Sequence, residues 1–215
     1  MAKIGIMGGT FDPVHNGHLL LGRQAYEEYG LDQVWYMPSG TPPHKRDHQV
    51  TGAGDRCAMV ALAIRDYPYF RLSDFEIRRE GNTYTAQTLQ LLADQYPQHR
   101  FYFIIGADSL YQIETWYHPE QVLGRTVILA ACREYPQASR TIEEQRVYLM
   151  ARYRKADIRL LHCEEVDISS GELRRMHARG TGICKYVPKA VEAYIEEHHL
   201  YQEQNKGVTP HDHNG

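Results

Sequence analysis

The sequence has 215 residues, which is enough for one α/β domain with a substantial core or at most two small domains. Its hydrophobic fraction of 42% and charged fraction of 24% are typical of a soluble globular protein. The formal net charge of -3 argues against a protein that binds nucleic acid over a broad basic face, but it allows a small basic pocket for one nucleotide.

Strand-like and helix-like segments alternate along the chain, starting with a short apolar segment over residues 3–7. After it, His18, Leu21, Ala25 and Tyr29 follow helical spacing, and Gly30 is a natural end for that helix. Residues 39–54 are rich in Gly, Pro, His and charge, which predicts a loop. Apolar segments predict further strands over residues 33–37, 70–75, 101–105, 126–131 and 158–161.

Start signals mark the helices expected between these strands. The signals are Asp55 for a helix that reaches about Tyr67, Thr85 for a helix that ends before Pro97, the Thr141–Glu144 pair for a basic helix that ends near Lys155, the Ser169–Glu172 pair, and Pro188 for the last helix.

Strands that alternate with helices predict an α/β fold, a Rossmann-like open parallel sheet with helices on both faces. We find no internal repeat and no linker, so we expect a single domain over residues 1–201. From Gln202 onward the sequence is polar, contains Gly and Pro, and lacks periodicity. This composition predicts a disordered tail over residues 202–215.

The four cysteines, Cys57, Cys132, Cys163 and Cys184, include no C-x-x-C pair, so neither a zinc ribbon nor a redox motif is indicated. We expect no signal peptide, because the first residues are a short apolar strand that runs into glycines. No apolar run approaches the roughly 18 residues that span a bilayer. Scattered cysteines without a secretory signal are typical of free thiols, and we therefore expect a cytoplasmic protein that does not contact a membrane.

The most specific segment is the turn after the first predicted strand, Gly8-Gly9-Thr10-Phe11-Asp12-Pro13-Val14-His15-Asn16-Gly17-His18. Gly8 and Gly9 have no Cβ, so the backbone there can approach a ligand closely. The helix that follows offers unpaired N–H groups and the positive end of its dipole, which attract phosphate. In an open parallel sheet, ligands bind at the carboxyl ends of the strands, where this turn lies. The absence of a G-x-G-x-x-G fingerprint disfavours hydride transfer.

His15 and His18 are three residues apart at the start of the predicted helix, so they face nearly the same direction. Each can donate hydrogen bonds to phosphate oxygens and, if protonated, can offset the charge that builds up on a pentacoordinate phosphorus. An isolated H-x-x-H pair is more often a metal site or a solvent-facing pair. The strand, the two glycines and the H-x-G-H in one register favour nucleotide chemistry instead.

A second signal lies far along the chain, in Ile168-Ser169-Ser170-Gly171-Glu172-Leu173-Arg174. The simplest interpretation is a capped helix with an ordinary surface arginine. A helix N-terminus with two hydroxyls and an arginine one turn later is also an anion site. In an enzyme that uses a triphosphate, it would hold the β- and γ-phosphates opposite the histidines.

With these motifs, the chain resembles the H-x-G-H nucleotidyltransferase superfamily and, more narrowly, the bacterial nicotinate-mononucleotide adenylyltransferases. The resemblance extends to about Tyr201, and the first motif by itself indicates only the superfamily. The matching segments stand in the expected order: Gly8 to Leu19, Pro42-Pro43-His44-Lys45, Tyr84-Thr85, Ile105-Gly106-Ala107-Asp108, Trp116-Tyr117, Ile168-Ser169-Ser170 with Arg174, and Tyr186-Val187-Pro188.

The resemblance implies a role for each matching residue. It implies that the catalytic residues are His15, His18 and Arg174, which would bind the ATP phosphates. It implies an ATP-binding site made of Gly8, Gly9, Thr10, Phe11, Gly106, Asp108, Ser169 and Ser170. It implies substrate-binding positions at Lys45, Tyr84, Thr85, Trp116, Tyr117 and Arg133, and no metal held by protein ligands alone.

The implied reaction transfers the adenylyl group of ATP to nicotinate mononucleotide, which gives nicotinate adenine dinucleotide and pyrophosphate in NAD biosynthesis. In this scheme Thr85 and Tyr117 contact the nicotinate carboxylate, Trp116 stacks on the pyridine ring, and Mg²⁺ is carried with ATP. ATP and nicotinate mononucleotide are then the partners, with no nucleic acid and no membrane. The choice between a monomer and a homo-oligomer stays open.

One position departs from the family pattern, because Gly171 stands where the family usually has Thr, and a hydroxyl near the triphosphate is missing. Three other interpretations stay open. They are a sister transferase that uses nicotinamide mononucleotide or pantetheine phosphate, a non-catalytic nucleotide-binding module, and a metal-binding protein that uses His15, His18, His211 and His213.

Overall fold

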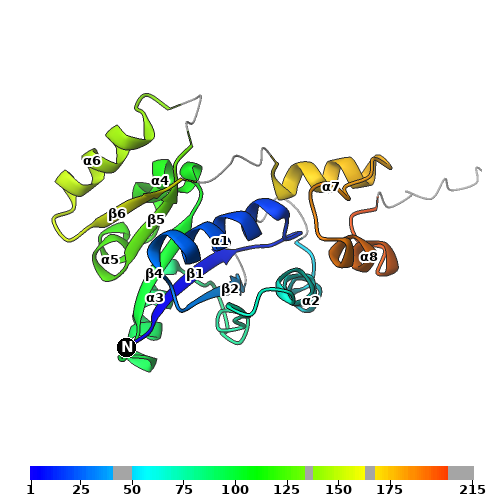
Figure 1. Ribbon diagram of the computed structural model, residues 1–215, viewed down its shortest axis with the longest axis horizontal. Coiled ribbons are helices and arrows are strands. Elements are labelled where there is room, and N and C mark those ends of the chain that lie inside the picture. Colours follow the sequence, from blue (N-terminus) through cyan, green and yellow to red (C-terminus); the bar gives the residue numbers. More distant parts are fainter. Residues whose placement is uncertain (41–49, 134–137, 163–167, 203–215) are drawn as a thin grey trace, which may run out of the picture.

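The computed structural model describes residues 1–40, 50–133, 138–162 and 168–202. In them, six parallel strands form one sheet in the order β3-β2-β1-β4-β5-β6 (Figure 1). The strands are β1 (Lys3–Gly9), β2 (Gln33–Pro38), β3 (Phe70–Leu72), β4 (Arg100–Ile105), β5 (Val127–Ala131) and β6 (Asp157–Leu161). The predicted Rossmann-like α/β fold is confirmed.

Helices connect the strands and continue past the last one. They are α1 (Asn16–Tyr29), α2 (Ala53–Ile64), α3 (Thr85–Gln95), α4 (Ala107–Gln112), the 3-10 helix η1 (Ile113–Thr115), α5 (Pro119–Arg125), α6 (Ile142–Arg152), α7 (Ser170–Ala178) and α8 (Lys189–Glu197). None of the helices in the described ranges has both the length and the apolar character that crossing a membrane requires.

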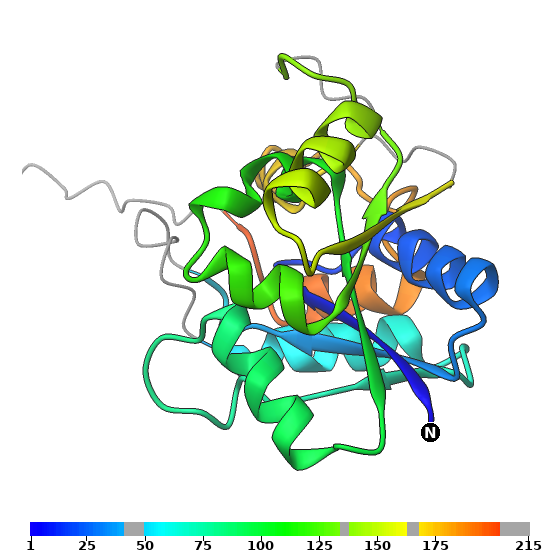
Figure 2. The same ribbon diagram turned by 90° about the vertical axis from the view of Figure 1, so that its left-hand side faces the viewer.

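Side-chain alternation along the strands divides the core into two layers. In β4, Phe101, Phe103 and Ile105 belong to one hydrophobic cluster, and Tyr102 and Ile104 belong to the other. Helices α1, α2, α7 and α8 cover the Tyr102 face, and α3, α4, α5 and α6 cover the Phe103 face. Figure 2 shows the helices on the two sides of the twisted sheet. Because both faces of the central strands are buried, β5 and all of β4 except Arg100 are apolar, and the sequence identified them for this reason. The edge strands β3 and β6 are more exposed and contain Arg71, Asp157 and Arg159.

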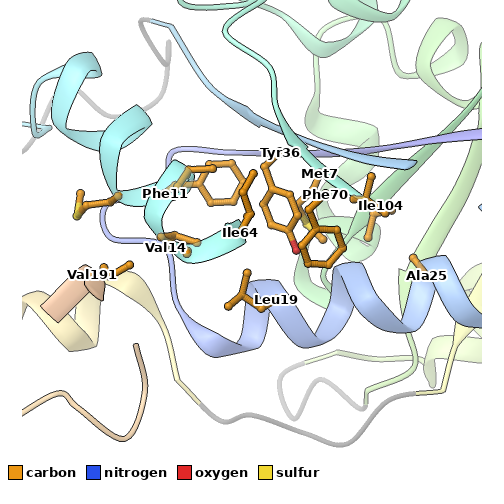
Figure 3. Packing of buried hydrophobic residues seen from close by; sticks show 14 of the residues in the cluster. Met7, Phe11, Val14, Leu19, Ala25, Tyr36, Ile64, Phe70, Ile104 and Val191 are labelled. Carbon is orange, nitrogen blue, oxygen red and sulfur yellow. The ribbon is translucent and has the colours of Figure 1, made fainter. Parts of the chain in front are cut away.

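Tyr36 of β2 is fully buried beneath α1 and holds the start of that helix against the sheet. Its hydroxyl donates a hydrogen bond to the main-chain oxygen of His18 at 3.0 Å, and its ring packs 4.9 Å from that of Phe70 (Figure 3). Burial raises the pKa of Tyr36, so the hydroxyl stays a donor. Gly22 allows this approach, because a Cβ there would collide with the Tyr36 hydroxyl.

The strand order creates a crevice at one edge of the sheet. From β1 the chain moves outward through β2 and β3, and it then returns to add β4, β5 and β6 on the other side of β1. The connections after β1 and β4 therefore leave toward opposite faces, and the carboxyl ends of these two strands lie at a topological switch point. This is where the fold places a ligand.

Several local predictions were wrong. The predicted cap Asp55 lies inside α2, whose N-cap is Gly52, and the helix ends at Ile64 rather than near Tyr67. The predicted cap Thr85 is the first residue of α3. The strand predicted to reach residue 75 ends at Leu72. Residues 107–125, for which no element was predicted, form α4, η1 and α5, because packing of short apolar stretches decides such elements.

Candidate active site

A cleft of about 1040 Å³ opens at the carboxyl ends of β1, β4 and β5. Its walls come from the start of α1, the segment before α3, the residues around η1, and the start of α7. It brings together fifteen of the predicted site residues: Gly8, Gly9, Thr10, His15, His18, Tyr84, Thr85, Gly106, Asp108, Trp116, Tyr117, Arg133, Ser169, Ser170 and Arg174.

Two predicted site residues are not among those that line the cleft. The ring of Phe11 is buried in the core and contacts the His18 ring edge-on, with centroids 5.0 Å apart. Lys45, with the rest of Pro42-Pro43-His44-Lys45, lies outside the described residues. The tail predicted over residues 202–215 also lies outside them from residue 203 onward.

His15 and His18 lie against each other at the start of α1. Their ring centroids are 3.8 Å apart with an interplanar angle of 33°. The main-chain N–H of His15 donates to Nδ1 of His18 at 3.2 Å, so Nδ1 is an acceptor and the His18 proton is on Nε2. The backbone of one histidine thus selects the tautomer of the other.

His15 is neutral in this structure near neutral pH. Its side chain is 7% exposed, and burial lowers its pKa from 6.5 to about 4. The pair therefore offers hydrogen-bond donors rather than two fixed positive charges.

The start of α7 approaches the turn between β1 and α1 from the far end of the chain. Ser169 is the N-cap of α7 and accepts from the N–H of Glu172 at 3.2 Å. The Ser170 hydroxyl donates to the main-chain oxygen of Pro13 at 2.8 Å, and Arg174 Nη1 donates to that of Asp12 at 2.6 Å. These bonds hold the two predicted phosphate-binding segments together across more than 150 residues of sequence.

Gly171 leaves space at this end of the cleft. A Cβ there would lie 3.6 Å from Nη1 of Arg175 and 3.8 Å from Nη2 of Arg174, which are ordinary contact distances. The glycine is therefore not required by packing, and the position can accept a side chain.

Aromatic residues form another part of the cleft lining. The rings of Tyr84 and Tyr117 lie 4.5 Å apart, and Trp116 meets Phe103 edge-on at 6.2 Å. Tyr117 is 46% exposed, an unusual fraction for an aromatic side chain beside a cleft. A flat ring bound here would cover this surface.

Two buried hydroxyls of the cleft are unpaired. Within the described residues, neither Oγ of Ser39 nor Oγ1 of Thr83 has a hydrogen-bond partner. Both residues line the cleft. Because an unpaired buried polar group costs free energy, a polar ligand group that reaches them would be favoured. No sequence motif marked these two positions.

Three further residues support the site but were not identified from the sequence. Asp12 is buried in the turn after β1, where it accepts a hydrogen bond from Tyr201 at 2.7 Å. Arg56, 2% exposed, donates to the main-chain oxygens of Thr51 at 2.9 Å and Thr10 at 2.8 Å. Asp12 stood inside the recognised motif without a role, whereas Arg56 and Tyr201 carry no local signal at all.

The alternative of a protein-held metal centre gains no support from the described ranges, in which no three His, Cys, Asp or Glu side chains gather as ligands. His211 and His213, which that interpretation requires, lie outside the described residues. Asp108, at the start of α4, lines the cleft as an exposed carboxylate that could contact a cation carried on a phosphate.

Comparisons with known proteins agree with this geometry. The cytidylyltransferase-like family profile matches residues 6–176. The chain is 42% identical over 201 residues to the probable nicotinate-nucleotide adenylyltransferase of Lachnoclostridium phytofermentans, covering 94% of this chain and 100% of the relative. It is 40% identical to the probable nicotinate-nucleotide adenylyltransferase of Neisseria meningitidis serogroup B, with coverage of 94% and 100%.

Solved structures share the fold at lower sequence identity. The Plasmodium falciparum nicotinic acid mononucleotide adenylyltransferase complexed with NaAD matches with a TM-score of 0.76 at 21% identity, covering 94% of this chain and 98% of that one. A putative nicotinate-nucleotide adenylyltransferase from Vibrio parahaemolyticus matches with a TM-score of 0.67 at 20% identity. The chain belongs to the cytidylyltransferase-like family and, within it, to the nicotinate-nucleotide adenylyltransferases.

Proposed function

We propose that this chain transfers the adenylyl group of ATP to nicotinate mononucleotide and releases pyrophosphate. The observation that carries the proposal is the meeting of His15 and His18 with Ser170 and Arg174 in a cleft that also has an aromatic lining. The family relatives support the same activity.

In the proposed reaction, an oxygen of the acceptor 5′-phosphate attacks the α-phosphorus of ATP. A new P–O bond forms, the bond from the α-phosphorus to the bridging oxygen breaks, and pyrophosphate leaves with the bond electrons. A phosphate monoester has its second pKa near about 6, so the nucleophile is already mostly ionised at neutral pH. No general base is needed, and the protein contributes positioning and charge stabilisation.

The histidines would act on the transferring phosphoryl group. With His15 neutral and the His18 proton on Nε2, each ring can donate one hydrogen bond to an oxygen of the α-phosphate. Gly8 and Gly9, at the end of β1, would let the nucleotide lie close to the backbone. The negative phosphates would also raise the pKa of His15 once they are bound.

The start of α7 would hold the β- and γ-phosphates. Its free N–H groups, its dipole and the guanidinium of Arg174 all favour an anion. The Ser169 hydroxyl is used by the cap to Glu172, so the main-chain N–H groups and Arg174 carry this role. Mg²⁺ enters as part of the substrate, bound to the triphosphate, with Asp108 as the nearby carboxylate.

The aromatic part of the cleft lining would bind the acceptor. The nicotinate ring of the mononucleotide is a pyridinium cation, and a Trp116 face attracts such a cation by about 0.5–2 kcal/mol. Thr85 and the Tyr117 segment would donate to the nicotinate carboxylate. The unpaired hydroxyls of Ser39 and Thr83 lie along the same wall and add donors for an anionic acceptor.

A comparison of acceptors tests the proposal. Pyrophosphate release is measured with Mg²⁺ and ATP, and with nicotinate mononucleotide, nicotinamide mononucleotide or pantetheine phosphate as the acceptor. We expect the highest kcat/KM with nicotinate mononucleotide. A preference for another acceptor would make the chain a sister transferase, and no release with any of them would make it a binding module.

The substitution His18→Ala tests the site itself. We expect kcat to fall by about 10²- to 10³-fold, because one donor to the transferring phosphate is lost. His162→Ala is the matched control, since His162 is exposed, pairs with Glu28 at 3.1 Å and does not line the cleft. A near-normal rate in folded His18→Ala protein would contradict the assignment.

A cytoplasmic location is part of the proposal. It is supported by the free thiols of Cys57, Cys132 and Cys184, which suit a reducing compartment.

A further inference from the structure

Asp12 is a buried carboxylate whose two oxygens have different partners. The residue is 1% exposed. Oδ1 accepts a hydrogen bond from the Tyr201 hydroxyl at 2.7 Å. Oδ2 lies 3.4 Å from the N–H of Thr51 and 4.0 Å from Nη1 of Arg174. A buried charge needs such partners, and the loss of one leaves an uncompensated oxygen.

The Arg174 side chain lies between Asp12 and the cleft. Its Nη1 donates to the main-chain oxygen of Asp12, whereas the separation from the Asp12 carboxylate is longer than a hydrogen bond. The side chain is 24% exposed and lines the cleft. The guanidinium is therefore anchored at one nitrogen and is not fully engaged by the carboxylate.

Tyr201 is held in place by an unusual backbone. After α8, the N–H of Leu200 donates to the main-chain oxygen of Ile195 at 2.9 Å, which turns the chain back toward the sheet. His199 and Tyr201 both have left-handed φ values, 51° and 60°. Residues other than glycine rarely adopt this backbone conformation, which costs free energy. The surrounding contacts therefore maintain it, and it brings the Tyr201 hydroxyl to Asp12.

Through these contacts the Tyr201 hydroxyl fixes the orientation of the Asp12 carboxylate. While it satisfies Oδ1, the carboxylate keeps its orientation, and Oδ2 stays at a distance from Arg174. Without the hydroxyl, Oδ1 would be a buried, unsatisfied acceptor, and the guanidinium of Arg174 already lies 4.0 Å from Oδ2 of the same carboxylate. Arg174 would then form a two-bond pair with Asp12, because bidentate arginine–carboxylate pairing is strong. That pairing would draw the Arg174 guanidinium away from the cleft.

We propose that Tyr201 is a positioning residue that, through Asp12, keeps Arg174 directed at the β- and γ-phosphates of ATP. The inference rests on the proposed function for the identity of the anion. It assigns to the C-terminal end of the described chain a role in nucleotide binding, although Tyr201 itself does not line the cleft.

The test compares ATP with AMP, which lacks the phosphates that Arg174 would hold. Affinities of both nucleotides are measured by titration calorimetry with Mg²⁺ for the wild type, Tyr201→Phe and Tyr194→Phe. Tyr194 is the matched control, because its hydroxyl donates to a carboxylate oxygen of Asp55 at 2.9 Å, away from the cleft. Tyr201→Phe should weaken ATP binding about three- to tenfold, the effect of one hydrogen bond at a charged group, and leave AMP binding unchanged.

A double substitution shows whether the effect passes through Arg174. On an Arg174→Ala background, Tyr201→Phe should change the ATP affinity less than about twofold, because the coupled partner is gone. In steady-state assays, the KM for ATP should rise while the KM for the acceptor stays constant. Unchanged ATP affinity in Tyr201→Phe, equal losses for ATP and AMP, or full additivity with Arg174→Ala would each overturn the inference.

The calorimetric result separates this inference from the proposed function. If the wild type bound ATP but formed no dinucleotide, the proposed function would fail. The difference between Tyr201→Phe and Tyr194→Phe in ATP affinity would still decide the role of Tyr201.

Discussion

His15 combines two requirements that conflict at low pH. It must be buried to lie against His18 and the phosphate site, and burial lowers its pKa to about 4. Between pH 6.5 and about 4 the unfolded chain binds a proton at this residue and the folded chain does not, so stability falls as the pH falls through that range. Above pH 6.5 both forms are neutral and the residue has no such effect.

This pH dependence can be measured. From pH 7.5 to pH 5, the wild type should lose about 2 kcal/mol more of its free energy of unfolding than a His15→Asn variant does. Asn is the suitable replacement, because it does not titrate and is a favoured N-cap at the position that His15 occupies on α1. Urea denaturation at the two pH values gives the comparison, and equal losses would show that His15 titrates normally in the folded protein.

The sequence could identify the residues of the candidate site where they lie together in a short segment. Gly8, Gly9, the two histidines, Ser169 and Arg174 lie in short segments whose spacing predicts a phosphate site, and all of them line the cleft. Asp12, Arg56 and Tyr201 each have a partner at least 39 residues away, and no local pattern encodes such contacts.

At the scale of elements, helix α6 begins as the sequence predicted. Thr141 accepts from the N–H of Glu144 at 3.2 Å, and the Glu144 carboxylate accepts from the N–H of Thr141 at 2.8 Å. This capping box satisfies donors that the helix itself leaves unpaired, and it needs no tertiary contact.

Removal of this cap should affect stability alone. Thr141→Ala should lower the free energy of unfolding by about 1 kcal/mol, and Thr141→Ser should restore most of it. Since Thr141 does not line the cleft, the KM for ATP should stay constant in both variants. Denaturant unfolding combined with steady-state kinetics checks this, and a change in KM would indicate that α6 is coupled to the site.

Elements without strong local signals were harder to predict. The central strands β4 and β5 were found because both of their faces are buried and each is an almost continuous apolar run. Helices α4 and α5 are six and seven residues long, too short for a clear period, and their formation depends on packing against β5 and neighbouring helices. The N-cap of α2 is Gly52, which offers no side-chain signal.

At the scale of the whole molecule, Arg56 joins segments that are far apart in the sequence. Its guanidinium donates to main-chain oxygens of Thr10, Gly40 and Thr51, which follow β1, follow β2 and precede α2. Burial lowers the pKa of Arg56, and the nearby Asp12 carboxylate opposes that shift. One buried cation thus ties the loops beside the cleft to each other.

Loss of this brace should destabilise the whole molecule. Arg56→Met should lower the free energy of unfolding by about 3 kcal/mol or more, because three partly buried main-chain oxygens lose the donor that Arg56 supplies. Arg71→Met is the matched control, since Arg71 also donates to main-chain oxygens, those of Pro68 and Phe70, but lies on the surface. Its effect should stay within about 0.5 kcal/mol. Similar effects of the two substitutions in urea denaturation would contradict the role of Arg56.

The sequence by itself determined the α/β class, most of the strands and the two segments proposed to bind phosphate, because apolar runs, capping residues and a glycine–histidine turn are recognisable in short stretches of sequence. Only the tertiary structure decided how those segments meet. The strand order puts the β1 turn at a switch point, and α7 returns to it through bonds from Ser170 and Arg174. Asp12, Arg56 and Tyr201 depend on the same long-range contacts, which form only when the whole chain has folded.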